Sequence, residues 1–172
     1  MIFGHSGYLC TRYNPFAGAV TKNDVLLEAV VAHPDRFLVS PCSGDARVLV
    51  ARLLTSPENA AWEVWRGGTF CGILMIDRIV PCVDARLQFV FFDDELSSKA
   101  PLLNDFVTLC FAEFGFHRLT FEAPAHMTTL TGFVRRKLGF STEGTRLSAY
   151  HDGVLWYDVA VLRRFAPEVT DA

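Results

Sequence analysis

The segment that decides the fold covers residues 114–144 and reads FGFHRLTFEAPAHMTTLTGFVRRKLGFSTEG. A strand is predicted at residues 117–123, and Pro124 ends it because proline cannot donate to a strand ladder. A helix is predicted at residues 128–138, where apolar residues recur at helical spacing and Gly139 supplies the stop. The positions expected to face inward are Leu130, Phe133, Val134 and Leu138.

The segments on both sides continue this alternation of helix and strand. Upstream, residues 101–114 predict a helix that begins at Pro101, where the missing N–H is not needed, and ends at Gly115. Downstream, residues 140–150 and 154–163 predict a hairpin around Asp152-Gly153, a dipeptide that favours tight hairpin turns.

Further upstream the apolar period changes from helical to alternating. Trp62, Val64 and Arg66 alternate with their neighbours, Gly67-Gly68 follows, and residues 69–80 resume a β-rich run. Residues 85–92 predict a third strand. The order from Trp62 onward is therefore β-β-β-α-β-α-β-β, which predicts an α/β protein with a mixed sheet and helices packed on it.

The first 44 residues are the least regular part of the chain, because glycine, proline, asparagine and serine recur there. One short helix is predicted at residues 24–32 and a strand at residues 37–39. A further helix is predicted at residues 45–54. We expect an irregular N-terminal arm at residues 1–44, a domain at residues 45–165 and a loose tail at residues 166–172.

Composition indicates one globular domain. The chain has 172 residues, of which 51% are hydrophobic, and a formal charge of −3, which argues against disorder and against a nucleic-acid partner. Apolar runs are too short to cross a membrane, and no signal peptide is visible. The five cysteines form no CxxC pair and the histidines lack metal-ligand spacing, so we expect reduced thiols, no metal and a cytoplasmic location.

Three stretches of the chain together resemble the GNAT acetyltransferases, and more narrowly the branch of ribosomal-protein N-terminal acetyltransferases. They are CFAEFGFHRLTFEAP at residues 110–124, FVRRKLGF at residues 133–140 and STEGTRL at residues 141–147. The resemblance implies a GNAT-like sheet and transfer of an acetyl group from acetyl-CoA to an amine of a protein or small molecule.

The same resemblance implies where acetyl-CoA would lie. Two parallel neighbours, residues 85–92 and 117–123, would separate at their C-terminal ends and admit the pantetheine arm like an added strand. The pyrophosphate would meet backbone N–H groups near Pro101. The residues implied for cofactor binding are Phe91, Phe92, Ser97, Ser98, Lys99, Ala100, Leu102 and Thr128.

The sequence departs from the family at two places in this site. The pyrophosphate loop normally has two glycines, but here it reads Ser-Ser-Lys-Ala-Pro-Leu at residues 97–102, where Lys99 could compensate as a point charge. Acidic residues stand just before it at 93–95. In the next helix, Thr128 and Arg135 occupy positions where many members have asparagine and a proton-donating tyrosine.

Two residues are candidates for the base that deprotonates the amine, Glu122 and His117, with His126 in the following loop. For both residues the sequence favours the plainer interpretation, in which Glu122 lies on a solvated strand face and His117 caps the preceding turn. The departures leave a second hypothesis open, in which the fold has lost catalysis and serves as a structural or assembly module. The chain also resembles GNAT-like genes found among phage structural genes, which implies a virion component for this alternative. Residues 1–44 would then contact other protein subunits.

Overall fold

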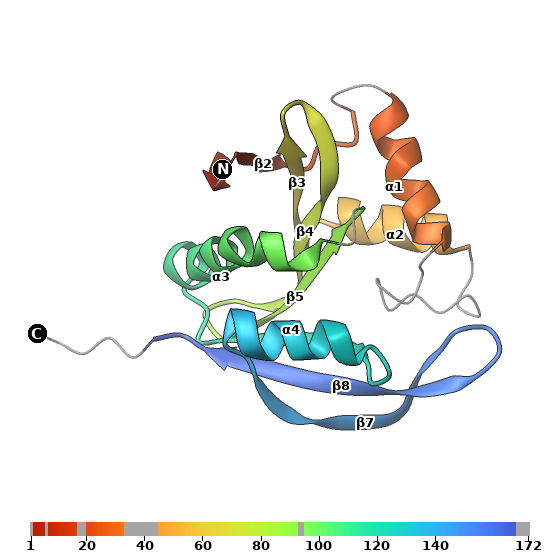
Figure 1. Ribbon diagram of the computed structural model, residues 1–172, viewed down its shortest axis with the longest axis vertical. Coiled ribbons are helices and arrows are strands. Elements are labelled where there is room, and N and C mark those ends of the chain that lie inside the picture. Colours follow the sequence, from red (N-terminus) through yellow and green to blue (C-terminus); the bar gives the residue numbers. More distant parts are fainter. Residues whose placement is uncertain (1, 6, 17–19, 33–44, 93–94, 168–172) are drawn as a thin grey trace, which may run out of the picture.

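The computed structural model describes residues 2–5, 7–16, 20–32, 45–92 and 95–167 (Figure 1). The strands are β1 (Ile2–His5), β2 (Tyr8–Arg12), β3 (Ala60–Arg66), β4 (Thr69–Val80), β5 (Asp84–Phe91), β6 (Arg118–Pro124), β7 (Ser141–His151) and β8 (Trp156–Phe165). The helices are α1 (Val20–Ala32), α2 (Ala46–Thr55), α3 (Ala100–Phe114) and α4 (Thr128–Leu138), with a short 3₁₀ turn, η3 (Leu96–Lys99), before α3.

All eight strands join one mixed sheet in the order β1-β2-β3-β4-β5-β6-β8-β7. The β5–β6 pair is parallel, and every other neighbouring pair is antiparallel. The predicted element order from Trp62 onward is confirmed, as is the α/β class. A parallel pair needs a crossover, and α3 provides it between β5 and β6.

Helices cover both faces of the sheet (Figure 1). Helices α3 and α4 bury Phe106, Val107 and Val134 against the larger apolar cluster, which includes Trp62 and Leu87. On the opposite face, α1 and α2 pack Leu26 and Val50 against Ile73, Met75 and Val90 in a second cluster. Strands β3, β4 and β5 therefore point alternate side chains towards α3 and α4 on one face and towards α1 and α2 on the other.

Glycines end the helices where the sequence predicted. Gly115 after α3 has φ of 63° and Gly139 after α4 has φ of 70°, the left-handed conformation that glycine adopts without strain. Gly67 and Gly68 join β3 to β4 with positive φ, which confirms that hairpin.

The N-terminal arm is more regular than predicted. Residues 2–5 and 8–12 form β1 and β2, and β2 pairs with β3, so the prediction of an irregular arm is wrong for these residues. A Cβ on Gly4 would lie 2.7 Å from the Tyr8 carbonyl oxygen, so this glycine allows the two strands to approach closely. The Phe3 ring stacks on Phe106 of α3 at 5.7 Å. The strand predicted at 37–39 lies outside the described residues.

Candidate functional site

The parallel strands β5 and β6 separate towards their C-terminal ends. Their pairing runs from Asp84↔Arg118 to Leu87↔Phe121 and stops there, although β5 continues to Phe91. Residues 88–91 remain paired with β4 on their other side, whereas β6 continues along β8. One backbone edge of β5 is thus left without a strand partner among the described residues, at the point predicted from the sequence.

Aromatic rings line the α3–α4 side of this divergence. The ring of Phe89 lies 5.4 Å from Phe121, 6.1 Å from Phe91 and 6.5 Å from Phe133 of α4. Phe89 and Phe91 are 9% and 4% exposed, so their side chains belong to the core. Phe92 points elsewhere: its ring meets Phe70 at 5.1 Å beside the second apolar cluster.

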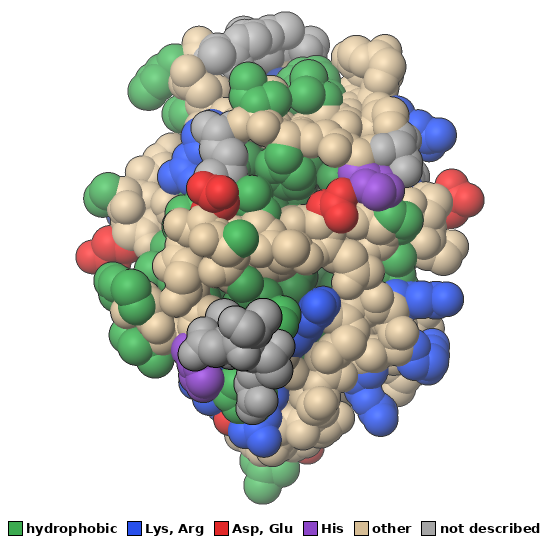
Figure 2. Space-filling view, turned by 90° about the vertical axis from the view of Figure 1, so that its left-hand side faces the viewer, with side chains coloured by type: hydrophobic (Ala, Val, Ile, Leu, Met, Phe, Trp, Pro, Cys, Tyr) green, Lys and Arg blue, Asp and Glu red, His purple; other side chains and the backbone are tan. Residues whose placement is uncertain are grey.

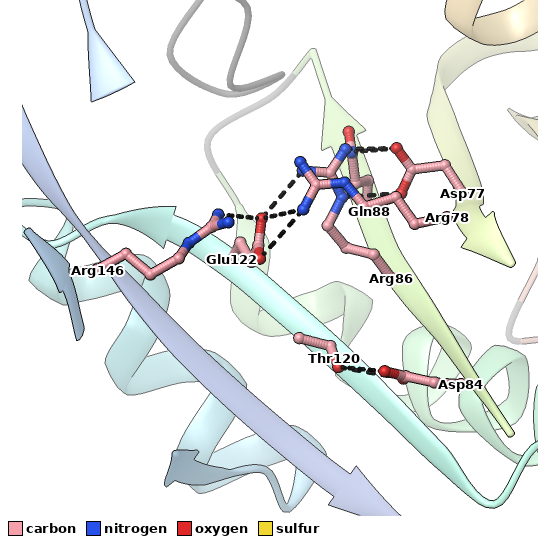
Figure 3. A network of polar contacts seen from close by, with 8 residues as sticks. All are labelled: Asp77, Arg78, Asp84, Arg86, Gln88, Thr120, Glu122 and Arg146. Carbon is pink, nitrogen blue, oxygen red and sulfur yellow. Dashed lines mark hydrogen bonds and ion pairs between the residues drawn. The ribbon is translucent and has the colours of Figure 1, made fainter. Parts of the chain in front are cut away.

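The other side of the divergence holds a buried polar network (Figure 3). Gln88 of β5 and Glu122 of β6 are the first residues beyond the last paired position. Arg86 contacts Asp77 through Nε at 2.8 Å and through Nη2, and Gln88 Nε2 donates to the same carboxylate at 3.1 Å. Asp77, Arg86 and Gln88 are 2%, 7% and 7% exposed, so the network is inside the protein.

Glu122 is held by three guanidinium groups from three strands. Its carboxylate lies 3.2 Å from Arg78, 3.1 Å from Arg86 and 2.7 Å from Arg146, and its side chain is 7% exposed. Burial by itself lowers the pKa of Arg86, but the hydrogen bond and attraction to Asp77, with those to Glu122, raise that pKa above its ordinary value. The positive charge of Arg86 is therefore stabilised beside the two carboxylates.

Two of these arginines stand at irregular positions of the backbone. Arg78 has φ of 50°, between Asp77 and Val80 where the register of β4 and β5 shifts. The register of β7 and β8 shifts directly after Arg146. Because a bulge redirects side chains, both irregularities turn an arginine towards Glu122.

No protein-family model and no curated protein sequence matches the chain. Among solved structures, spermidine N-acetyltransferase from Vibrio cholerae, in complex with CoA and spermine, superposes with a TM-score of 0.76 at 11% identity, over 94% of this chain and 96% of that one. The chain has the GNAT acetyltransferase fold.

Two further similar structures are acetyltransferases of ribosomal proteins, the branch that the sequence resembles. RimL, a ribosomal L7/L12 alpha-N-protein acetyltransferase in complex with CoA, gives a TM-score of 0.72 at 13% identity, over 96% of this chain and 98% of that chain. A ribosomal-protein-S5-alanine acetyltransferase from Vibrio fischeri gives 0.69 at 10% identity, over 99% and 100%. At these identities the similarity concerns the fold.

The loop expected to bind pyrophosphate uses part of its backbone for local hydrogen bonds. It forms η3, where the N–H of Ala100 already bonds Ser97 O and Pro101 has no N–H to offer. Ser97 and Ser98 are exposed, and the Ser98 hydroxyl donates to Glu95 O at 2.8 Å. The first turn of α3 thus offers fewer backbone donors than a glycine loop, while Asp93 and Asp94 lie outside the described residues.

Lys99 does not present its charge to solvent. The residue is 0% exposed, and its ammonium lies 5.6 Å from the ring centroids of both Tyr8 and Phe91 and 3.2 Å from Glu95 O. Its predicted role as a point charge that compensates for the missing glycines stays a prediction, and in this structure the ammonium is packed inside the protein. Leu102, at 1% exposure, likewise gives its side chain to the core.

The remaining predicted residues are spread over the sheet. His117 precedes β6, its N–H bonding Val83 O at 3.1 Å and its ring lying 5.4 Å from Phe165. Since a strand rises about 3.3 Å per residue, His117 stands about 16 Å from Glu122, at the opposite end of the strand. The structure does not bring these two candidates together. Thr128 is exposed at the start of α4, and Arg135 is exposed in its last turn.

Sequence reasoning missed most of the polar network. Asp77 and Arg78 stand out in the sequence as charges within the apolar run 69–80, and Arg86 and Gln88 alternate with apolar neighbours on the next strand. That pattern marks a polar face on two strands, but only the register shows that it meets Glu122 and Arg146.

Other features of the described residues lie away from this network. A cavity of about 520 Å³ is lined by residues between β2 and α1 and by the C-terminal part of α2. Basic side chains gather in the lower right of the side shown in Figure 2, with acidic side chains above them. None of the described helices is long and apolar enough to cross a membrane, and the described residues hold no group of three metal-ligating side chains.

Proposed function

We propose that the chain is an acetyltransferase that binds acetyl-CoA between β5 and β6 and transfers the acetyl group to an amine. One observation carries the proposal: pairing stops at Leu87↔Phe121 while β5 runs on to Phe91. The backbone edge beyond Leu87, where pairing with β6 has stopped, suits the pantetheine amides, which can pair with it like an added strand. The similar spermidine N-acetyltransferase and RimL structures, both in complex with CoA, support this assignment.

In the transfer step, the amine nitrogen attacks the thioester carbonyl carbon. The new C–N bond forms as the C–S bond breaks, CoA leaves as its thiolate, and the nitrogen loses a proton to a base. Glu122 suits this role poorly, because its carboxylate already neutralises three guanidinium groups. His117 stands at the wrong end of β6.

We assign the role of the base that accepts this proton to His126, which follows the C-terminal end of β6 by two residues. Its side chain is exposed, and its ring lies 4.6 Å from the ring of Tyr157. An imidazole can accept a proton at neutral pH, and a positioned base contributes about 10²–10⁴-fold to rate.

Titration calorimetry with acetyl-CoA tests the proposal. We expect micromolar binding to the wild-type chain and about tenfold weaker binding to Ser97→Glu, which adds a negative charge before α3, where the pyrophosphate would lie. Thr108→Glu is the matched control, because Thr108 is exposed on the same helix two turns further on. We expect its affinity to stay within twofold of wild type.

Failure to bind acetyl-CoA at millimolar concentration would exclude the acetyltransferase proposal and favour the alternative of a non-catalytic structural module. That alternative has lost one of its supports, since β1 and β2 of the N-terminal arm are paired within this chain. Once binding is established, the acceptor can be identified by measuring acetyl-CoA consumption in the presence of a panel of primary amines. Mass spectrometry of the product then shows which amine has been acetylated.

A further inference from the structure

We propose that the acceptor carries a carboxylate next to its amine, and that Arg78 and Arg146 bind this carboxylate. The inference rests on the proposed function, because it places the acceptor beside the acetyl thioester. It names a substrate class: a free amino acid, or a peptide with an acidic residue at its N-terminus.

The position of the arginines supports this. Glu122, which they contact, is one residue beyond the last β5–β6 pair, at the mouth of the gap proposed for pantetheine. Arg78 reaches it from β4 and Arg146 from β7, on the two sides of β6 (Figure 3). An acceptor held by both would have its amine near the thioester.

The charges of the network do not cancel, and the excess favours binding of an anion. Three guanidinium groups face two carboxylates, so one positive charge is in excess. Asp77 engages Arg86 through two nitrogens, and the third nitrogen of Arg86 shares Glu122 with Arg78 and Arg146. The whole chain has a formal charge of −3, so attraction for an anion must arise locally from these side chains.

Arg78 and Arg146 are also accessible. Their side chains are 56% and 46% exposed, and each contacts Glu122 through a single nitrogen, Nη1 of Arg78 and Nη2 of Arg146. A guanidinium has five N–H donors and binds carboxylates with two of them in parallel. Each arginine can therefore keep Glu122 and still donate to a ligand.

The backbone at Arg78 adopts an uncommon conformation. A non-glycine residue with φ of 50° is unfavourable, and Arg78 keeps this conformation at a half-exposed position. Such strain concentrates at binding sites, where it fixes the direction of a side chain. Here it directs the guanidinium towards Glu122.

Gln88 supplies a complementary group for the amine. Its Nε2 is committed to Asp77, and its Oε1 has no hydrogen-bond partner among the described residues although Gln88 is only 7% exposed. A buried acceptor oxygen without a donor is costly, so a donor from a ligand would stabilise it. Gln88 and the two arginines thus offer partners for both ends of an amino acid, whereas a polyamine such as spermine would meet excess positive charge.

Product analogues test the inference without catalysis. Binding of N-acetylglycine and of N-acetylglycinamide, which differ only in the carboxylate, is measured by ligand-observed NMR on the full chain. We expect N-acetylglycine to bind at least tenfold more tightly, and the doubly substituted Arg78→Ala, Arg146→Ala chain to lose this difference. Arg163→Ala is the control, because Arg163 is 40% exposed and lies 3.6 Å from Glu143, outside the network. We expect it to keep the full preference.

A third ligand distinguishes the two sources of the carboxylate. N-acetyl-aspartic acid α-amide carries its charge on the side chain, as an acidic peptide terminus would. Tighter binding of this compound than of N-acetylglycine assigns the site to acidic peptide termini, and the reverse assigns it to free amino acids. Equal affinities of all three ligands, or a preference that survives the double substitution, would overturn the inference. Acetyl-CoA calorimetry on the same protein separates that failure from failure of the proposed function.

Discussion

Replacement of Glu122 by glutamine separates a counter-ion from a catalytic base. The substitution keeps the shape of the side chain and removes its charge, while three guanidinium groups stay in place. If Glu122 serves as their shared counter-ion, its loss destabilises the fold. If it serves as a base, its loss stops acetyl transfer and leaves stability almost unchanged.

The expected cost follows from the burial of each contact. The contact with buried Arg86 is charge-assisted and contributes about 1.5–3 kcal/mol. Those with Arg78 and Arg146, at 56% and 46% side-chain exposure, contribute about 0–1 kcal/mol each. Asp77 still pairs with Arg86 after the substitution, so the penalty for an unpaired buried charge does not apply in full. We expect a loss of about 2–4 kcal/mol in the free energy of unfolding.

Urea denaturation and thermal melting measure this loss. For a chain of this size the expected fall in melting temperature is about 4–16 °C. Glu143→Gln is the matched control, because Glu143 meets Arg118 at 3.3 Å and Arg163 at 3.6 Å with 31% side-chain exposure, and should cost less than about 1 kcal/mol. A Glu122→Gln chain as stable as wild type but unable to transfer acetyl groups would refute the counter-ion interpretation.

Three further outcomes are expected. Lys99→Met should change acetyl-CoA affinity by less than about threefold in calorimetry, because its ammonium is buried beside Tyr8 and Phe91; a tenfold loss would contradict this. His126→Gln should lower kcat by about 10²-fold while His117→Gln leaves it unchanged, which steady-state kinetics can check. Burial raises the pKa of the Cys10 and Cys110 thiols from 9.0 to about 12. The thiols therefore ionise at lower pH in the unfolded chain than in the folded one. Their contribution to the free energy of unfolding is complete below pH 9 and is lost as the pH rises from 9 to 12. The free energy of unfolding from urea denaturation should fall accordingly, by about 1 kcal/mol per pH unit for each thiol, and Cys110→Ala should remove the share of one thiol from that slope.

The elements from Trp62 onward could be predicted because their signals are local. Helix ends coincide with Gly115 and Gly139, and the first hairpin with Gly67-Gly68. Each of these turns is specified within a few residues of the chain. The gap between β5 and β6 was predictable for a different reason, namely that the element order resembles a known fold.

The partners of Glu122 could not be predicted in this way. Arg78 and Arg146 are far from it in sequence, and each is directed by a register shift that depends on strand pairing. An alternating polar pattern shows that a strand has a polar face, but which charges meet there depends on the neighbours that the sheet brings together.

Neither the N-terminal strands nor the surroundings of Lys99 could be predicted, and the reason is the same for both. The first hairpin is short, and β2 depends for its partner on β3, more than 50 residues further along the chain, so no local pattern specifies it. Without β2 there was no Tyr8 ring for the Lys99 ammonium to contact, and this lysine was predicted to act as a point charge near the pyrophosphate. With β2 in place, Tyr8 and Phe91 enclose the stem and charge of Lys99 between the first turn of α3 and the edge of the gap. The altered loop is therefore a packed junction of the sheet with α3. Under the proposed function, acetyl-CoA would have to bind chiefly along the part of β5 beyond Leu87, where pairing with β6 has stopped.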